Sequence, residues 1–543
     1  MAVTDFAYQA FDEPKADESS PRARSVRDRM VPPMRGGELW GWLGPLLVTV
    51  FGGVLRFAGL GHPRAVVFDE TYYAKDAFSL ISWLVERVAI KDADKAILAG
   101  NTDIWQKCTA ETLDKCASYV VHPPLGKWMI GAGEWLFGMN PYGWRFAAAV
   151  AGTLSIFILA RLARRMTRST LLGCFAGLLL ALDGLHFVLS RTALLDIFLM
   201  FWVLAAFACL VVDRDKARQR LVDWYENSPI SPQGPGLGLR PWRIAAGVCL
   251  GAAMGVKWSG LAFAVAFAVM SLLWDVGARR AVGVRRPYAG VFSKDAPNGL
   301  LAFAVAPFVT YMATWTGWFA TATGYGRNWD QSTSSGPFYF LFDSARSWVK
   351  YQWQVFTFHN GLETSHPYMS DPWQWPLLLR PVAFHYEGRQ DACGVKDCSE
   401  AVLGVGTPVI WFGALLALVG LIAWYVATRD WRAGAVLLAY AMGWLPWFYF
   451  AIASNRTMFL FYAIPMVPFM VLAITLCAGL LIGPAARRAE ASPGVRRTLG
   501  AAVVGAFALL ALINFWWLHP VLSAELIPYT EWKARMLFDK RWI

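Results

Sequence analysis

The chain has 543 residues, of which 56% are apolar or aromatic and only 16% are charged. A typical soluble domain has about 25% charged residues, so this composition excludes a soluble globular, a disordered and a fibrous protein. The net charge of +12 is compatible with nucleic acid, with anionic lipid or with a membrane-orientation signal, and the positions of the charges must decide among them.

Residues 1–38 are polar, of mixed charge and rich in proline, which predicts a disordered cytoplasmic tail rather than a signal peptide. Apolar stretches long enough to cross a bilayer, about 17–25 residues each, follow within 39–518. We place these eleven spans near 39–60, 142–164, 170–190, 192–212, 243–259, 260–278, 298–316, 406–428, 433–453, 457–483 and 498–518. The predicted fold class is therefore an all-α polytopic membrane protein.

Basic residues gather in the N-terminal tail and in every second short connection, which predicts that these segments are cytoplasmic. The two long loops, 61–141 and 317–405, hold more acidic than basic residues and are predicted to be extracytoplasmic. An odd number of spans places the C-terminal tail, 519–543, on the same outer side. The charge excess thus indicates orientation, and nucleic acid is not expected as a partner.

Both long loops are expected to carry amphipathic helices at the membrane interface, near 71–88 and 338–358. The C-terminal tail, with Trp532, Leu537, Phe538 and Trp542, is expected to behave in the same way. Cys108 and Cys116 share the first loop, and Cys393 and Cys398 share the second, which predicts one disulfide in each loop. Free thiols are the alternative.

Several charged residues lie inside or near the ends of the predicted spans, nearly all at the outer face, and they are informative because charge is costly in a bilayer. A transporter would concentrate such residues at the midplane, whereas cations at headgroup depth suit a lipid phosphate. The alternative is structural: Arg56 and Lys257 extend to the interface, and Asp183 pairs with Arg191. The residues are Arg56, Asp69, Glu70, Arg145, Asp183, Arg191, Asp196, Lys257 and Arg456.

Seven motifs occur in order: VVFDETYYAKDA (66–77), VHPPLGKW (121–128), NPYGWRFAAAVAGT (140–153), LSRTALLDIFLMFW (189–202), GVKWSGL (255–261), SHPYMSDPWQWPLLLRP (365–381) and NRTMFLFYAIPMVPFM (455–470). Over residues 45–518 the chain resembles the bacterial protein O-mannosyltransferases, which are GT-C membrane glycosyltransferases. The resemblance implies transfer of mannose from a polyprenyl-phosphate-mannose donor to Ser/Thr of secreted polypeptides at the outer face of the plasma membrane. The second long loop has no room for the β-trefoil domain of the eukaryotic members.

The resemblance implies inversion at the sugar carbon, with Asp69 as the general base and Glu70 orienting the acceptor, Arg145 or the sugar. Exchange of these two roles stays open, and a helix-capping role for the pair is compatible with catalysis. A hydroxyl nucleophile benefits from a base, whereas a phosphate leaving group asks for cations rather than for an acid.

We expect Arg145 and Lys257 to bind the donor phosphate, with Arg56 behind them and Arg191 as a weaker candidate paired with Asp196 or Asp183. His122 and Lys127 contact phosphate or sugar, or only hold their loop, and Asn455 and Arg456 approach the same site from the tenth span. The acceptor or sugar path is expected to involve His366, Asp371, Trp373 and Trp375.

The seven histidines show no metal-ligand spacing, so no cofactor is predicted, although a divalent cation remains an option for a GT-C enzyme. Two other functions stay open. One is a GT-C transferase that modifies a lipid or glycan, and the other, of a different class, is a transporter.

Overall fold

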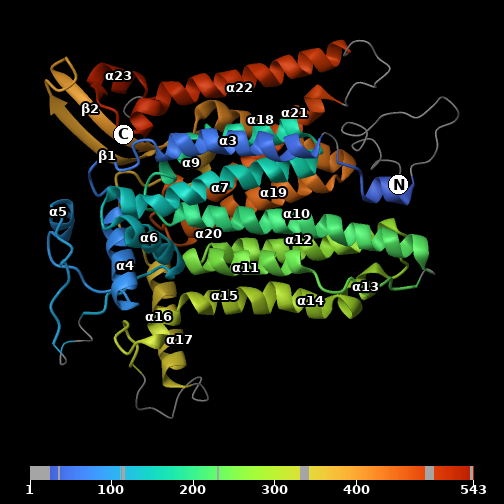
Figure 1. The fold of residues 1–543 in the computed structure, drawn as a ribbon, viewed down its shortest axis with the longest axis horizontal. Helices are drawn as coiled ribbons and strands as arrows, with labels where there is room; N and C mark the ends of the chain where they lie inside the picture. Colours follow the sequence, from blue (N-terminus) through green and yellow to red (C-terminus); the bar gives the residue numbers. More distant parts are fainter. Residues whose placement is uncertain are drawn as a thin grey trace.

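A computed structural model describes residues 25–34, 37–109, 112, 116–228, 231–329, 342–483, 494–538 and 542. The long helices lie side by side, and the sheet and several shorter helices gather at one end of the bundle (Figure 1). Two of those helices, α4 (Glu70–Trp83) and α17 (Asp343–Asn360), run across the direction of the long helices. The molecule therefore has one helical bundle and a separate layer at the end of that bundle.

Nine helices within the described residues are long and apolar enough to cross a membrane, and two shorter apolar helices, α8 (Thr170–Ala181) and α11 (Pro241–Val256), accompany them. Together they correspond to the eleven predicted stretches, which confirms the predominantly helical membrane fold. The nine are α3 (Glu38–Phe57), α7 (Pro141–Thr167), α10 (Asp196–Asn227), α12 (Gly260–Ala281), α14 (Ala296–Leu300) through η2 (Leu301–Val305) to α15 (Ala306–Thr314), α18 (Pro408–Thr428), α19 (Trp431–Trp444) with α20 (Pro446–Ala453), η4 (Leu460–Met466) with α21 (Val467–Ile482), and α22 (Val495–Leu522).

The predicted span 170–190 is interrupted at Asp183, where α8 gives way to α9 (Gly184–Leu189). Asp183 Oδ1 accepts a hydrogen bond from the His186 amide at 2.9 Å, so this side chain caps the new helix. Its Oδ2 accepts from Trp411 Nε1 at 2.8 Å. The expected pairing of Asp183 with Arg191 is therefore wrong, because the carboxylate is used in capping and in joining α9 to α18.

The predicted cytoplasmic end of the bundle is held together by buried ion pairs. Arg240 donates to Asp213 at 2.5 Å and to Asp275 at 2.6 Å, which joins the start of α11 to α10 and α12. Arg243 also pairs with both carboxylates. The basic residues that predict orientation thus have a second role in packing.

The loop helices differ in detail from expectation. Helix α4 ends at Trp83 because Leu84 adopts a left-handed conformation, and Val88 then donates to the Cys116 carbonyl in an extended segment. The helix expected near 338–358 is α17, and residues 338–341 lie outside the described residues. The remaining short elements are α5 (Ala93–Leu98), α6 (Leu125–Phe137), α13 (Pro287–Lys294), α16 (Thr316–Ala320), η3 (Pro372–Leu377) and α23 (Tyr529–Ala534).

A three-stranded antiparallel sheet in order β1-β2-β3 stands at the end of the bundle that also carries α4 and α17, where only helices were expected. Strand β1 (Val382–Gln390) and β2 (Asp397–Gly404) form a hairpin, and β3 (Ile527–Pro528) adds the C-terminal tail. The structure joins Cys393 to Cys398 at the tip of this hairpin and Cys108 to Cys116 in the first loop, the two pairs that the sequence predicts.

Two expectations about the termini need correction. Part of the tail expected to be disordered forms α2 (Val26–Met30), whose Met30 is 3% exposed and packs against α10 and α12, while residues 1–24 lie outside the described residues. Trp542, expected at the membrane interface, is fully buried, and its Nε1 donates to the Leu378 carbonyl at 2.8 Å. Both segments are held by tertiary contacts that a local pattern does not reveal.

Candidate active site

Asp69 immediately precedes helix α4, and the residue before it has an unusual backbone conformation. Phe68 has φ of 49°, in the left-handed region that a bulky side chain rarely adopts. Its ring stacks on Phe384 at 5.0 Å between centroids and meets Phe461 edge-on at 5.7 Å, so aromatic packing holds the strained residue. Such strain is typical of functional sites because it fixes the direction of a neighbouring side chain.

The carboxyl group of Asp69 is electrostatically distinctive. Burial raises its pKa to about 6, the nearby positive charge of Lys257 opposes this shift, and the negative charge of Asp196 adds to it. A carboxylate with a pKa in this range is mostly ionised at pH 7 and is still basic enough to accept a proton from a reacting hydroxyl.

Lys257 directly follows α11, and Asp196 is the first residue of α10. Lys257 Nζ lies 2.7 Å from Asp196 Oδ2 and 5.1 Å from the ring centroid of Tyr462. Lys257 is 9% exposed and borders a cavity. Its ammonium group is therefore held at the wall of the cavity, and Asp196 fixes its orientation.

Three further side chains with ring or guanidinium nitrogens lie at the polar end of this cavity: His122, His359 and Arg456. The two imidazole rings stack at 5.1 Å between centroids, and Arg456 Nη2 donates to His359 Nδ1 at 3.1 Å. Burial lowers the pKa of His359 to about 4, and its other nitrogen, Nε2, lies 2.8 Å from the Val121 carbonyl. His359 is therefore neutral, with Nε2–H as donor and Nδ1 as acceptor for the arginine.

Arg456 has unused hydrogen-bonding capacity at this position. Its Nε is buried and has no hydrogen-bond partner among the described residues. Burial also lowers the pKa of His122 well below its usual value, so that ring is neutral and offers one N–H donor. Lys257, Arg456 and His122 together form a group of donors suited to an anion.

The cavity below these donors has a volume of about 720 Å³ and is mostly apolar. It runs between α12 and α19 with α20, and residues 261–269 of α12 span about 12 Å along the helix axis at 1.5 Å per residue. A site with cations at one end and an apolar groove toward the membrane interior matches an amphiphile with a phosphate head. The apolar lining includes Leu261, Ala262, Phe263, Val265, Ala266, Val269, Leu438, Met442, Pro446, Trp447 and Phe450.

Glu70 orients Arg145, which is one of the roles expected for it, but Arg145 has a different role from the one expected. Arg145 uses all five of its N–H groups, on Glu70 and on the carbonyls of Leu60, Pro63 and Ala65. Both residues are fully buried. The prediction that Arg145 binds the donor phosphate is therefore wrong for this arrangement, because the guanidinium has no donor left.

Arg56 and Arg191 are also engaged within the protein. Arg56 is fully buried, and its guanidinium bonds to Ser190, His186 and three backbone carbonyls. Arg191 donates to the carbonyls of residues 55, 56, 58 and 59, which lie at the C-terminal end of α3 and just beyond it. A cation at that end is favourable, so Arg191 caps α3 rather than pairing with Asp196 or Asp183.

Lys127 also fails to reach the cavity. It is 1% exposed and forms an ion pair with Glu86, with Asp76 Oδ2 at 4.0 Å from its Nζ. It therefore joins α6 to the segment after α4, which is the loop-holding alternative. Asn455 is exposed, with φ of 44°, and is not among the residues that line the cavity.

The four residues expected along the acceptor path differ in position and exposure. His366 meets Phe68 edge-on at 6.1 Å, and so lies beside the strained residue that precedes Asp69. Trp373, at 47% exposure, and Asp371 lie at the start of η3. Trp375 is fully buried with its Nε1 bonded to Ser370 at 3.1 Å, so its assignment to a path open to an acceptor is wrong.

Among the cavity residues that the sequence analysis did not single out are two polar side chains beside Lys257 and Arg456, His359 and Tyr462. His359 lies in the last turn of the amphipathic helix α17, where its polarity fits an interfacial helix and gives no separate signal. Tyr462 is contained in the motif at 455–470 and is visible there only as one aromatic residue among several.

Comparison with known proteins agrees with this architecture. Residues 110–285 match the family model described as dolichyl-phosphate-mannose-protein mannosyltransferase. Residues 344–542 match the model described as the C-terminal four TMM region of protein-O-mannosyltransferase.

Two relatives and one solved structure show how far the similarity extends. The chain is 38% identical to a polyprenol-phosphate-mannose–protein mannosyltransferase of Mycolicibacterium smegmatis, over 97% of this chain and 98% of the relative. It is 33% identical to the protein of the same name in Corynebacterium glutamicum, over 91% and 92% of the two chains. The fold is similar to the Saccharomyces cerevisiae Pmt1-Pmt2 complex bound to the sugar donor, with a TM-score of 0.68 at 15% identity over 98% of this chain and 97% of that one. On this near full-length similarity, the chain belongs to the polyprenol-phosphate-mannose–protein mannosyltransferase family and has the GT-C membrane fold expected of it.

Proposed function

We propose that this protein transfers mannose from polyprenol-phosphate-mannose to serine and threonine hydroxyls of polypeptides at the outer face of the membrane. The membership of the family supports the donor and the protein acceptor. The observation that carries the assignment of the site is the placement of Lys257, Arg456 and His122 at the polar end of a long apolar cavity, with the charges of Lys257 and Asp196 acting on the buried carboxyl group of Asp69.

The donor occupies the cavity with its phosphate at Lys257, Arg456 and the N–H of His122, and with its polyprenyl chain along α12 and α19. When the bond from the sugar carbon to the phosphate oxygen breaks, negative charge develops on that phosphate. These donors stabilise the charge because they are already in place and lie in a partly buried setting. No proton donor is needed for this leaving group.

Asp69 accepts the proton of the acceptor hydroxyl as its oxygen attacks the sugar carbon from the face opposite the phosphate, which inverts that carbon. Glu70 is unsuited to this role, because its oxygens already accept four hydrogen bonds, from Arg145 twice and from the amides of Val67 and Ala193. Its tight fixation positions the first turn of α4 and so the neighbouring Asp69.

The membrane orientation follows from charge. The loops that carry Asp69, His122 and His359 belong to the two acidic segments, whereas the basic segments lie at the opposite ends of the spans. We infer that the N-terminus faces the cytoplasm and that the active site and the C-terminal tail face outward, in the cell membrane.

The direct test supplies purified protein with polyprenyl-phosphate-mannose and a peptide rich in Ser, Thr and Pro, and maps the product by mass spectrometry. Mannose on a Ser or Thr side chain, absent with Asp69→Asn protein and with a peptide in which Ala replaces every Ser and Thr, is the expected result. Transfer to added lipid or glycan with no peptide product would contradict the proposal in favour of a different acceptor.

A further inference from the structure

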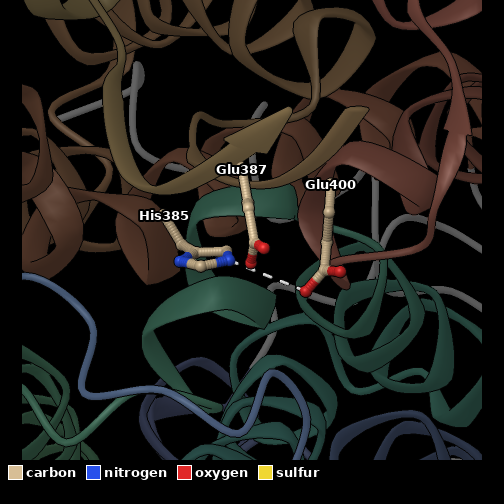
Figure 2. A group of neighbouring side chains, drawn as sticks. All are labelled: His385, Glu387 and Glu400. Carbon is tan, nitrogen blue, oxygen red and sulfur yellow. Dashed lines mark ion pairs between the residues drawn. The ribbon is translucent and has the colours of Figure 1, made fainter. Parts of the chain in front are cut away.

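The β1–β2 hairpin carries a polar cluster that the transfer reaction does not use. His385, Glu387 and Arg389 occupy alternate positions of β1 and so share one face of the strand, and Glu400 of β2 stands directly opposite Glu387. One nitrogen of His385 and one oxygen from each glutamate all lie within 4.8 Å of one another. Figure 2 shows the three side chains pointing toward a common space.

This arrangement is costly without a compensating positive charge. The carboxylates of Glu387 and Glu400 lie directly opposite each other across the antiparallel pair and repel. Water does little to screen this repulsion at Glu400, because that residue is only 2% exposed. Arg389 Nη2 supplies one positive charge, at 3.1 Å from Glu387 Oε2 and from Glu400 Oε2. The side chain of Arg389 is 43% exposed, so it can turn away into solvent.

The other oxygen of Glu400 faces a nitrogen that has no hydrogen bond. Glu400 Oε1 lies 3.6 Å from His385 Nε2, beyond hydrogen-bond distance. His385 Nε2 is itself buried and has no hydrogen-bond partner among the described residues. The buried carboxylate oxygen and the buried imidazole nitrogen thus form an ion pair only when the imidazole is protonated (Figure 2), and a metal ion between them would engage both when it is neutral.

A cavity of about 240 Å³ opens beside these atoms, between the hairpin and residues 62–65 of the first loop. Glu387 is about half exposed, so the cavity has a path to solvent. His62 also borders it, but its Nε2 bonds the Ala524 carbonyl at 2.8 Å, which leaves it outside the ligand set.

We propose that His385, Glu387 and Glu400 bind one divalent cation, with zinc as the best match. Zinc is usually four-coordinate, and one imidazole nitrogen with two carboxylates can fill three of its coordination positions. Magnesium and calcium, in contrast, prefer oxygen ligands alone. The two carboxylates balance the charge of the ion, and Arg389 moves into solvent when the ion binds.

The ion would act on stability rather than on the reacting atoms. It would fix the β1–β2 hairpin, which borders the same cavity as residues 62–65. That segment in turn contacts Arg145, because the carbonyls of Pro63 and Ala65 accept hydrogen bonds from its guanidinium. The inference does not depend on the proposed transfer reaction, since it concerns a separate cluster and its test measures bound metal.

The experiment uses the full-length protein in detergent, treated with chelator, freed of it and then titrated with Zn²⁺ alone. Bound zinc is measured by inductively coupled plasma mass spectrometry and the apparent Tm by scanning fluorimetry. We expect one zinc per chain with a higher Tm, and binding at least about tenfold weaker in Glu400→Gln and in His385→Gln. Arg389→Met should bind zinc more tightly than the unchanged protein, because a competing cation is removed.

Two further variants keep the result decisive. Glu387→Gln changes a half-exposed ligand and replaces Glu400→Gln if that variant fails to fold. Glu525→Gln is the matched control: Glu525 Oε1 lies 2.7 Å from His519 Nδ1, and this His–Glu pair has no second carboxylate in a metal-binding group among the residues that the structure describes. Absence of bound zinc, unchanged binding in Glu387→Gln and His385→Gln, or equal loss in Glu525→Gln would overturn the proposal.

Discussion

Arg145 and Glu70, which are 75 positions apart in the chain, form a doubly hydrogen-bonded ion pair that is closed to solvent. Arg145 Nε lies 2.8 Å from Glu70 Oε1, and Nη2 lies 2.9 Å from Oε2. The pair joins the start of α7 to the start of α4, directly beside Asp69. It therefore bears on two adjacent acidic residues whose roles the sequence leaves open to exchange: Glu70 is engaged as a structural anchor, which favours Asp69 for the proposed role of base.

Replacement of Asp69 by Asn should lower the turnover number by about 10²–10⁴-fold, the range for loss of a positioned general base. The change keeps the size of the side chain and removes only its charge and basicity. Mannosyl transfer to peptide is the measurement, and an unchanged apparent Tm shows that the fold is intact. Near-normal turnover in a folded variant would remove Asp69 from the role of base.

The pH dependence of transfer should report the same group. Because the pKa of Asp69 is raised to about 6 and the base acts in its ionised form, kcat/KM for the peptide should fall about tenfold per pH unit below this value and level off above it. His359, with a pKa lowered to about 4, stays neutral across this range. A profile without an inflection between pH 5 and 7 would argue against the assignment.

Replacement of Arg145 by Met should destabilise the protein rather than weaken donor binding specifically. It leaves Glu70 charged and buried, a loss of about 3–5 kcal/mol for a broken buried pair. A strong drop in the apparent Tm and in the yield of folded protein is expected. A folded Arg145→Met protein with normal Tm and a raised KM for the donor would instead restore Arg145 to the phosphate site.

Replacement of Arg456 by Ala should raise the KM for the donor or lower kcat by about 10–100-fold, because a charge-assisted hydrogen bond contributes about 1.5–3 kcal/mol. Arg456→Lys should recover part of the loss, since it keeps the charge. Arg380→Ala serves as the control: its guanidinium bonds the Pro367 carbonyl at 2.6 Å, away from the cavity. Equal effects of the two alanine variants would show a general rather than a local cause.

Replacement of Ala262 by Trp should obstruct the apolar groove and so change the dependence on donor chain length. Overfilling a packed site costs about 1–3 kcal/mol, which corresponds to a rise of about tenfold in the KM of a long-chain donor. A donor with a short prenyl chain should be affected much less. Ala501→Trp, on the exposed face of α22, is the control for a bulky residue facing lipid.

Much of the fold could be predicted because the local hydropathy of a membrane protein identifies its spanning helices. Each span must satisfy its backbone internally and be apolar over its length, so eleven helices are visible one by one. The hairpin at residues 382–404 is not visible in the sequence, because its strands carry His385, Glu387 and Glu400 at positions where a pattern of alternating apolar residues would be sought.

The candidate site could be predicted only in part, because the role of a charged residue depends on its partners. Arg145, Arg191 and Arg456 all stand at ends of spans that the sequence predicts to face outward, and no local feature of the sequence distinguishes their roles. In the tertiary structure Arg145 pairs with Glu70, Arg191 bonds the carbonyls at the end of α3, and Arg456 Nε, beside the cavity, has no hydrogen-bond partner in the described part of the chain.

The sequence by itself determined the class of the protein, its spans and its family resemblance, since these depend on hydropathy and on ordered motifs, and it predicts the orientation from the placement of basic residues. Only the tertiary structure decided which charges are available to a substrate. A buried charge must be neutralised by whichever group lies nearest in space, and contacts between residues such as Glu70 and Arg145 are created by folding rather than by spacing along the chain.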